Sequence, residues 1–243
     1  MTQDSSSSDL TRIAREQGLV PLLRGVLRHM DAVATGAIGT EKLQLLMIPG
    51  RLVQAVRNKT FVEQLAGEFE ELLKKGRVRK DFEHSEECQA SLQQLLAALE
   101  EPPVDDMKFR ALKSIFIATA TTGTTKDVPP QLILNIARTL SSGELIVLAT
   151  AFRIVRDDPG LGEKLHGVAD AWVAQIARVS GIGLTGLVEH YESLLASKNL
   201  VNHRHQSDRS GLKMGKHFGL TDFGLRLCEL MQRGDDEIAT LNS

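Results

Sequence analysis

Hydrophobic positions recur at intervals of three and four over most of the chain before residue 200, and strand-like alternation is almost absent there. The clearest stripe lies in residues 61–73, with charged side chains on the opposite side, and consists of Phe61, Leu65, Phe69, Leu72 and Leu73. Comparable stripes predict helices in residues 86–99, from about residue 107, in 132–140 and in 144–155. The pattern therefore predicts a mostly α-helical protein.

Polar stretches and Pro- or Gly-rich breaks divide the chain. The first ten residues, "MTQDSSSSDL", are expected to form a disordered tail. Residues 11–140 are expected to form a helical domain, in which the acids of "EPPVDD" are placed to cap the helix that follows. Ser141 or Ser142 should cap the first helix of a second domain, residues 141–233, and residues 234–243 should be a flexible tail.

The order of elements in the second domain predicts a winged-helix module with a small β-hairpin. A tight turn at Gly181 and Gly183 separates a short helix from the helix of residues 184–199, and residues 200–221 resemble two strands joined by a polar loop. Thr221 or Asp222 should cap a last helix. The expected core face of the 184–199 helix consists of Leu184, Leu187, Val188, Tyr191, Leu194 and Leu195.

Residues 141–233 resemble winged-helix proteins of the multiple-antibiotic-resistance-regulator type. Leu195, Asn199 and Leu200 match the ending of the recognition helix in that group, with Asn199 replacing the usual Gly of a left-handed cap. Leu220, Thr221, Gly224 and Leu227 match the start of the helix after the wing. The segment "FRALKSIF…LSSGELIVL" further resembles uncharacterised bacterial proteins. The resemblance implies DNA binding, in the form of a dimeric bacterial transcriptional regulator.

If the module binds double-stranded DNA, Thr185, Glu189 and His190 are expected to contact bases. Phosphate contacts would come from the expected wing, through Arg204, Arg209, Lys213 and Lys216. Between Trp172 and Leu220 the chain has six Lys and Arg against three Asp and Glu, a local excess of three positive charges. Against this, the expected outward face of the reading helix carries Glu189 and Glu192 and no cation beside them.

The alternative is a protein-interaction module, in which the same fold does not bind DNA but docks a protein partner. The net charge of −2 marks no general affinity for nucleic acid, and aromatic residues are only 4% of the chain. A homodimer would have to use the N-terminal helices, since the last helix is expected to end soon after the wing. The stripe of residues 61–73 could form that dimer surface, although a core face is the more ordinary role.

The sequence offers no positive evidence of an enzyme, a cofactor or a metal site. His203, His205 and His217 could share a face of the expected hairpin, but surface histidines explain them better. The acidic pairs in residues 105–106, 157–158 and 235–236 are expected to lie in loops and cap helices. Two distant cysteines, a polar N-terminus and no long apolar run predict a cytoplasmic protein without a membrane segment.

Overall fold

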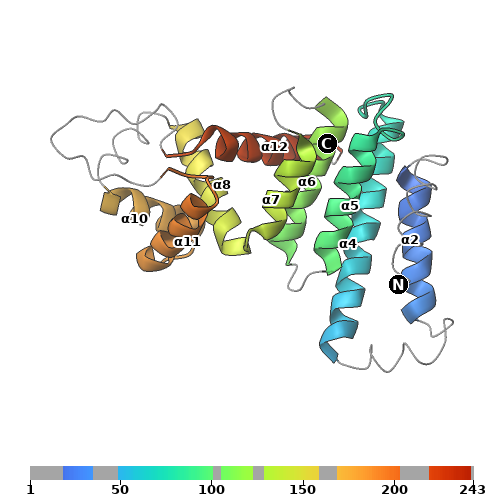
Figure 1. The fold of residues 1–243 in the computed structure, drawn as a ribbon, viewed down its shortest axis with the longest axis horizontal. Coiled ribbons are helices and arrows are strands. Elements are labelled where there is room, and N and C mark those ends of the chain that lie inside the picture. The colour runs from blue at the N-terminus through green and yellow to red at the C-terminus, as the bar shows by residue number, and fades with distance from the viewer. Residues whose placement is uncertain are drawn as a thin grey trace. The chain divides into compact units, whose positions relative to one another are not determined.

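The computed structural model describes residues 19–34, 49–100, 105–122, 129–158, 169–202 and 219–241. Within these ranges the chain forms nine α-helices (Figure 1). It divides into two compact units, and each contains segments that are distant in sequence. The first unit comprises residues 1–104, 112–138 and 233–243, and the second comprises 105–111 and 139–232. The predicted all-helical character is thus confirmed for the described residues.

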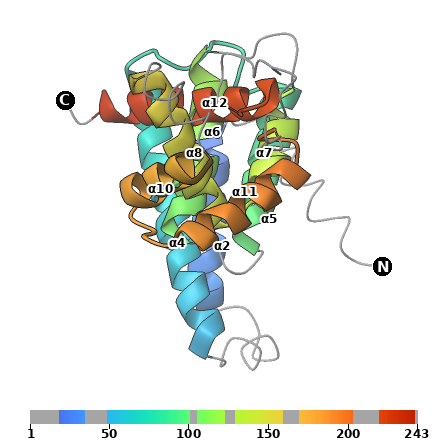
Figure 2. The same ribbon diagram turned by 90° about the vertical axis from the view of Figure 1, so that its left-hand side faces the viewer.

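The first unit contains α2 (Leu19–Ala34), α4 (Pro49–Lys74), α5 (Glu86–Glu100) and α7 (Pro130–Thr139). It also contains most of α6 (Asp106–Thr122) and the end of α12 (Asp222–Ala239). Helix α2 packs against α4, beside which it lies in both views (Figures 1 and 2).

The core of the first unit is built on the stripe that the sequence predicted. Phe61, Leu65, Phe69 and Leu72 of α4 are all buried. Phe69 contacts the rings of Phe82 and Phe116 at centroid distances of 6.4 and 5.9 Å, and these two rings are 5.8 Å apart. Aromatic pairs at this spacing add to the stabilisation from burial itself. The stripe is therefore a core face and is not available as a dimer surface.

One acidic pair supplies the helix cap that the sequence predicted, and another departs from its expected loop position. Asp105 does cap α6, because its Oδ1 accepts a hydrogen bond from the backbone N–H of Lys108 at 2.9 Å. Asp235 and Asp236, however, lie inside α12, and Asp235 accepts a hydrogen bond from Ser114 Oγ at 2.6 Å. Residues 234–239, expected to begin a flexible tail, are the last turns of this helix.

The second unit is built on three helices, each of which packs against the other two. They are α8 (Ser142–Asp157), α10 (Ala169–Ser180) and α11 (Thr185–Ser197). Ser141 caps α8 in a capping box with Glu144, as the sequence predicted. Gly181 and Gly183 take positive φ, and the turn they form bends α11 by 99° from α10. Two helices at this angle, joined by a short Gly-containing turn, have helix-turn-helix geometry.

The end of α11 is the left-handed cap that the sequence predicted. Asn199 has φ of 57°, and its N–H bonds to the carbonyl of Ala196 at 3.0 Å. The N–H of Leu200 bonds to the carbonyl of Leu195 at 3.0 Å, and both leucines are buried. These two bonds and the apolar contact form a Schellman motif, with Asn in the position usually held by Gly.

The predicted winged-helix module with a β-hairpin is wrong for the part of the chain that the structure describes, which has no β-strand. Val201 and Leu220 form an isolated antiparallel bridge. On the helix side of the bridge extended pairing ends, since the left-handed Asn199 belongs to the cap of α11 and the hydroxyl of Thr221 caps α12 through the N–H of Gly224. On the other side the N–H of Asn202 bonds to the carbonyl of Gly219, and the described residues end there. Residues 203–218, which include the expected wing, lie outside the described residues.

Gly224 is required by a backbone contact. A Cβ built on Gly224 would lie 2.0 Å from the carbonyl oxygen of Leu200, whose N–H forms one of the two hydrogen bonds in the cap of α11. The glycine at position 224 is therefore explained by the close approach of α12 to the end of α11.

We expect Gly224→Ala to lower the free energy of unfolding of the second unit by about 1–3 kcal/mol, because the backbone must shift to admit the methyl group. Gly186→Ala is the matched control: no heavy atom lies within 4 Å of its added Cβ, so it should stabilise α11 by about 0.5–1 kcal/mol. Urea unfolding followed by Trp172 fluorescence measures both, since Trp172 is the single tryptophan of the chain. Equal stability of the two variants would contradict the assigned contact.

Candidate functional site

The residues predicted to contact DNA bases lie together on α11. Thr185, Glu189 and His190 are all exposed, in the N-terminal half of the helix. The four residues predicted to contact phosphates, Arg204, Arg209, Lys213 and Lys216, lie outside the described residues. The structure therefore brings together the base-contact residues alone, and their role stays a prediction.

The N-terminal half of α11 also exposes two large apolar side chains. Leu184 has 66% of its surface exposed and Leu187 has 37%, although both were predicted to face the core. Val188 and Leu195 of the predicted face are buried, and Tyr191 and Leu194 are half-buried. The prediction was wrong for Leu184 and Leu187, which are exposed although Val188 beside them is buried.

The residue at the start of α11 is poorly suited to a helix cap. Leu184 occupies the N-cap position in an extended conformation, and no side chain accepts a hydrogen bond there. Asn, Asp, Ser and Thr are strongly preferred at this position, because their oxygens accept from the free N–H groups of the first turn. An exposed leucine at an N-cap satisfies neither capping nor burial.

The C-terminal half of α11 is fixed to α8 by polar and close contacts. Lys198 Nζ donates hydrogen bonds to Glu144 Oε1 and, at 3.2 Å, to the carbonyl oxygen of Thr139. The ring of Tyr191 lies against Gly143, where an added Cβ would meet its Cζ at 2.1 Å. These contacts hold α11 in place without help from Leu184 and Leu187.

Helix α10 holds α11 through its buried tryptophan. The indole Nε1 of Trp172 donates a hydrogen bond to Glu192 Oε1 at 3.0 Å. Glu192 was expected to be a solvated acid facing outward, but it is half-buried and serves this contact. Trp172 therefore reports on the attachment of α11.

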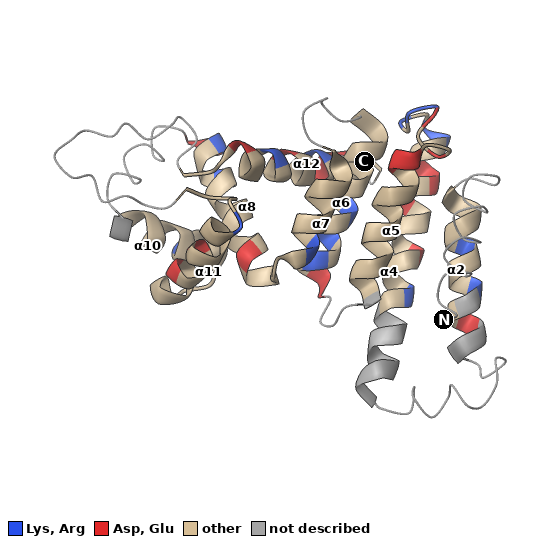
Figure 3. Ribbon diagram, viewed as in Figure 1, with Lys and Arg blue, Asp and Glu red and all other residues tan. Residues whose placement is uncertain are grey.

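The charge on α11 is negative. The helix contains Glu189 and Glu192 and no Lys or Arg. Lys198, which directly follows the helix, forms an ion pair with Glu144. Arg178, at the end of α10, donates a hydrogen bond to Gln175 Oε1 at 2.6 Å. Figure 3 shows how cations and acids are distributed over the described residues. The two described cations at the ends of α10 and α11 thus have partners already.

Glu144 is the central ionised group of the second unit. Its side chain is only 3% exposed. Burial by itself would raise the pKa of Glu144, but hydrogen bonds from Lys198 and from the N–H and hydroxyl of Ser141 outweigh it, so the pKa lies below its ordinary value.

Because this pKa is lowered on folding, ionised Glu144 stabilises the unit fully above the ordinary pKa of 4.5, and the stabilisation is lost as the pH falls through the folded pKa. We expect Glu144→Gln to lower the free energy of unfolding by about 1–3 kcal/mol at pH 7. Gln keeps a capping-box acceptor but not the charge. Urea midpoints below pH 5 should then fall less steeply in the variant than in the parent protein.

Glu189→Gln is the matched control, as it removes an exposed acid from the same unit. It should change the stability at pH 7 by no more than about 0.5 kcal/mol. Parallel pH profiles for the parent protein and Glu144→Gln would contradict the role assigned to Glu144.

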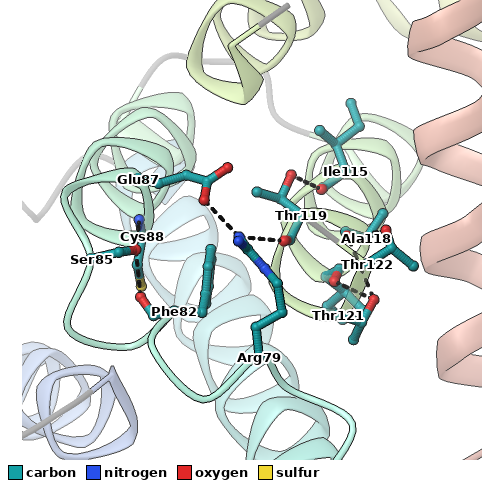
Figure 4. Close-up of polar contacts among 11 residues, drawn as sticks. Arg79, Phe82, Ser85, Glu87, Cys88, Ile115, Ala118, Thr119, Thr121 and Thr122 are labelled. Atoms are coloured by element: carbon teal, nitrogen blue, oxygen red, sulfur yellow. Dashed lines mark hydrogen bonds and ion pairs between the residues drawn. The ribbon is translucent and has the colours of Figure 1, made fainter. Parts of the chain in front are cut away.

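A second polar cluster lies in the first unit, around Arg79 (Figure 4). Its Nη2 donates to Glu87 Oε2 at 2.6 Å and to the carbonyl oxygen of Thr119 at 3.0 Å, and the guanidinium lies 5.2 Å from the Phe82 ring centroid. The backbone N–H of Arg79 also bonds to the carbonyl of Ala120 at 3.0 Å. Arg79 thus donates hydrogen bonds to two carbonyl oxygens near the end of α6 that have no partner within the helix, which is a structural role.

The cysteines are poor nucleophiles. Burial, aided by Glu83 and Glu87, raises the pKa of the Cys88 thiol to about 12. Burial also raises the pKa of Cys228, whose Sγ lies 3.9 Å from the carbonyl oxygen of Leu148. Both thiols therefore stay protonated near neutral pH, and the thiolate is the reactive form.

A groove along α2 and the possible metal-ligating side chains are two further places to examine for a site. An open groove of about 560 Å³ runs along α2, but its Arg24 pairs with Glu70 at 2.7 Å and its Asp31 pairs with Lys59 at 2.7 Å. Within the described ranges no three His, Cys, Asp or Glu side chains are grouped to hold a metal ion. The three histidines weighed as ligands fall outside those ranges.

Comparison with protein-family models, curated proteins and solved structures found no match to this chain. No single described helix combines the length and hydropathy needed to cross a bilayer; of the described segments, α10 and α11 reach them only as a bent pair.

Proposed function

We propose that the second unit is a protein-interaction module and that the first turns of α11 form its docking surface. The observation that carries the proposal is the exposure of Leu184 and Leu187 on a helix that other contacts already hold. Exposed apolar residues scattered singly need no explanation. Here two of them share one face, three residues apart, at a position where leucine also weakens the helix cap.

The charges around this surface favour a protein over DNA. A DNA-contacting helix gains most of its affinity from Lys and Arg, which displace counterions from phosphates. Helix α11 has no Lys or Arg, and its exposed Glu189 would meet the phosphate field at an energetic cost. An apolar partner surface would be stabilised by about 25 cal/mol for each Å² of leucine that it covers.

DNA binding is the second candidate, and the helix-turn-helix geometry favours it. The 99° bend between α10 and α11 fits that motif, and Thr185, Glu189 and His190 are exposed on its second helix. In this alternative the phosphate contacts would come from Arg204, Arg209, Lys213 and Lys216. Random-sequence duplex DNA, titrated by fluorescence anisotropy at low and moderate salt, separates the candidates, since only DNA binding gives steeply salt-dependent affinity.

We expect Leu184→Asp to stabilise the second unit and to weaken docking. Asp at the N-cap should raise the free energy of unfolding by about 1 kcal/mol, measured by urea unfolding of the purified protein. Affinity capture from extracts of the source cells, followed by titration of each purified captured protein, should show binding at least about tenfold weaker than that of the parent protein.

Leu132→Asp is the matched control, because Leu132 is an exposed leucine of the first unit, with 46% of its surface exposed. It should capture the same proteins as the parent chain. If Leu184→Asp and Leu132→Asp captured the same proteins with unchanged affinity, Leu184 would have no part in docking. Salt-dependent DNA binding that is lost in Arg209→Ala and Lys213→Ala would favour the second candidate instead.

A further inference from the structure

We infer that the segment docked on α11 is a cationic amphipathic helix of a partner protein. This inference rests on the proposed docking function and specifies the chemistry of the partner. Two features of the surface carry it, the shape of its apolar patch and the sign of the charge beside it.

The apolar patch is narrow and follows the helix axis. Leu184 at the N-cap of α11 and Leu187 in its first turn lie three residues apart, and we refer to these two exposed side chains at the start of the helix as the ridge. Ile182, in the turn before the helix, is half-buried and precedes this ridge. A ridge of this kind fits the groove between the side-chain rows of another helix, which is the usual way in which two helices pack.

The unneutralised charge beside the ridge is acidic. Glu189 is exposed and makes no hydrogen bond or ion pair with any described residue. Two described cations at the ends of α10 and α11 already have partners: Lys198 pairs with Glu144, and Arg178 donates a hydrogen bond to Gln175. A partner that covers the ridge therefore gains from Lys or Arg at the edge of its apolar face, where such charges govern specificity and the rate of association.

The dipole of α11 would favour an anionic partner at the N-terminus of the helix, but its effect is smaller than that of the Glu189 charge. Its N-terminus carries the equivalent of roughly half a positive charge, which decays within the first turn. Glu189 carries a full negative charge in the second turn and is exposed toward solvent. The net preference beyond the first turn is therefore for cations.

Two synthetic helical peptides of about 18 residues test the inference. One contains Leu and Lys, the other Leu and Glu, with leucines at the same positions. Each is titrated into the full chain by calorimetry and by Trp172 fluorescence, since Trp172 is bonded to Glu192 on α11. We expect the Leu/Lys peptide to bind at least about tenfold more tightly than the Leu/Glu peptide.

Three variants make the result specific. Glu189→Lys should lower the affinity for the Leu/Lys peptide by about fivefold and raise the affinity for the Leu/Glu peptide, because the charge beside the ridge is reversed. Leu187→Glu should abolish binding of the Leu/Glu peptide and weaken the Leu/Lys peptide through the loss of apolar contact. Leu132→Glu, in the first unit, should change neither titration.

The outcomes separate the inference from the proposed function. Equal binding of both peptides, or no binding of either, overturns the cationic helix as the partner. Docking itself stands in those cases if Leu184→Asp still loses the proteins captured by the parent chain. Peptide binding that is the same in Leu187→Glu and in the parent protein places the contact elsewhere and overturns both.

Discussion

The second unit depends on one buried carboxylate. Glu144 closes the capping box of α8 through Ser141 and accepts a hydrogen bond from Lys198, directly after α11. A carboxylate removed from water is costly unless every oxygen finds a donor, so the start of α8 and the end of α11 must stay together. Tyr191 against Gly143 and Trp172 bonded to Glu192 complete this attachment at two further points. Leu184 and Leu187, at the start of α11, are consequently not needed to hold the helix in place.

The features that could be predicted from the sequence are the local ones. Ser141, Asp105, Asn199 and Thr221 were each expected at a helix end, and each is found there. A cap is decided within about five residues, so the information that determines it lies in the neighbouring sequence. The stripe of α4 was equally predictable, because a long apolar face of a helix must be buried somewhere.

What could not be predicted depends on contacts between distant segments. Periodicity shows that Leu184, Leu187 and Val188 share a face, but only the placement of α8 and α10 decides that Val188 is covered while the two leucines are exposed. Among the described residues the expected hairpin is reduced to the bridge between Val201 and Leu220, because the caps at Asn199 and Thr221 follow directly on its helix side. Glu192 was assigned to solvent, as no sequence signal marks its bond with Trp172, twenty residues earlier.

The exposure of Leu184 and Leu187 can be interpreted because other contacts hold α11 in place. If Leu184 and Leu187 stabilised the fold, their exposure would be only a consequence of how the helices pack. Replacing Leu184 at the N-cap with a polar residue would then lower the free energy of unfolding. The structure supports the opposite view, because Leu184 makes no capping bond and is two-thirds exposed. Leu184 contributes to neither the cap nor the core, and it lies beside a second exposed leucine and an acid without a partner among the described residues, which is the arrangement that the proposed docking function would explain. If the start of α11 is the docking surface that we propose, its attachment through Glu144 reduces the entropy lost on binding, since the surface is held in place in advance.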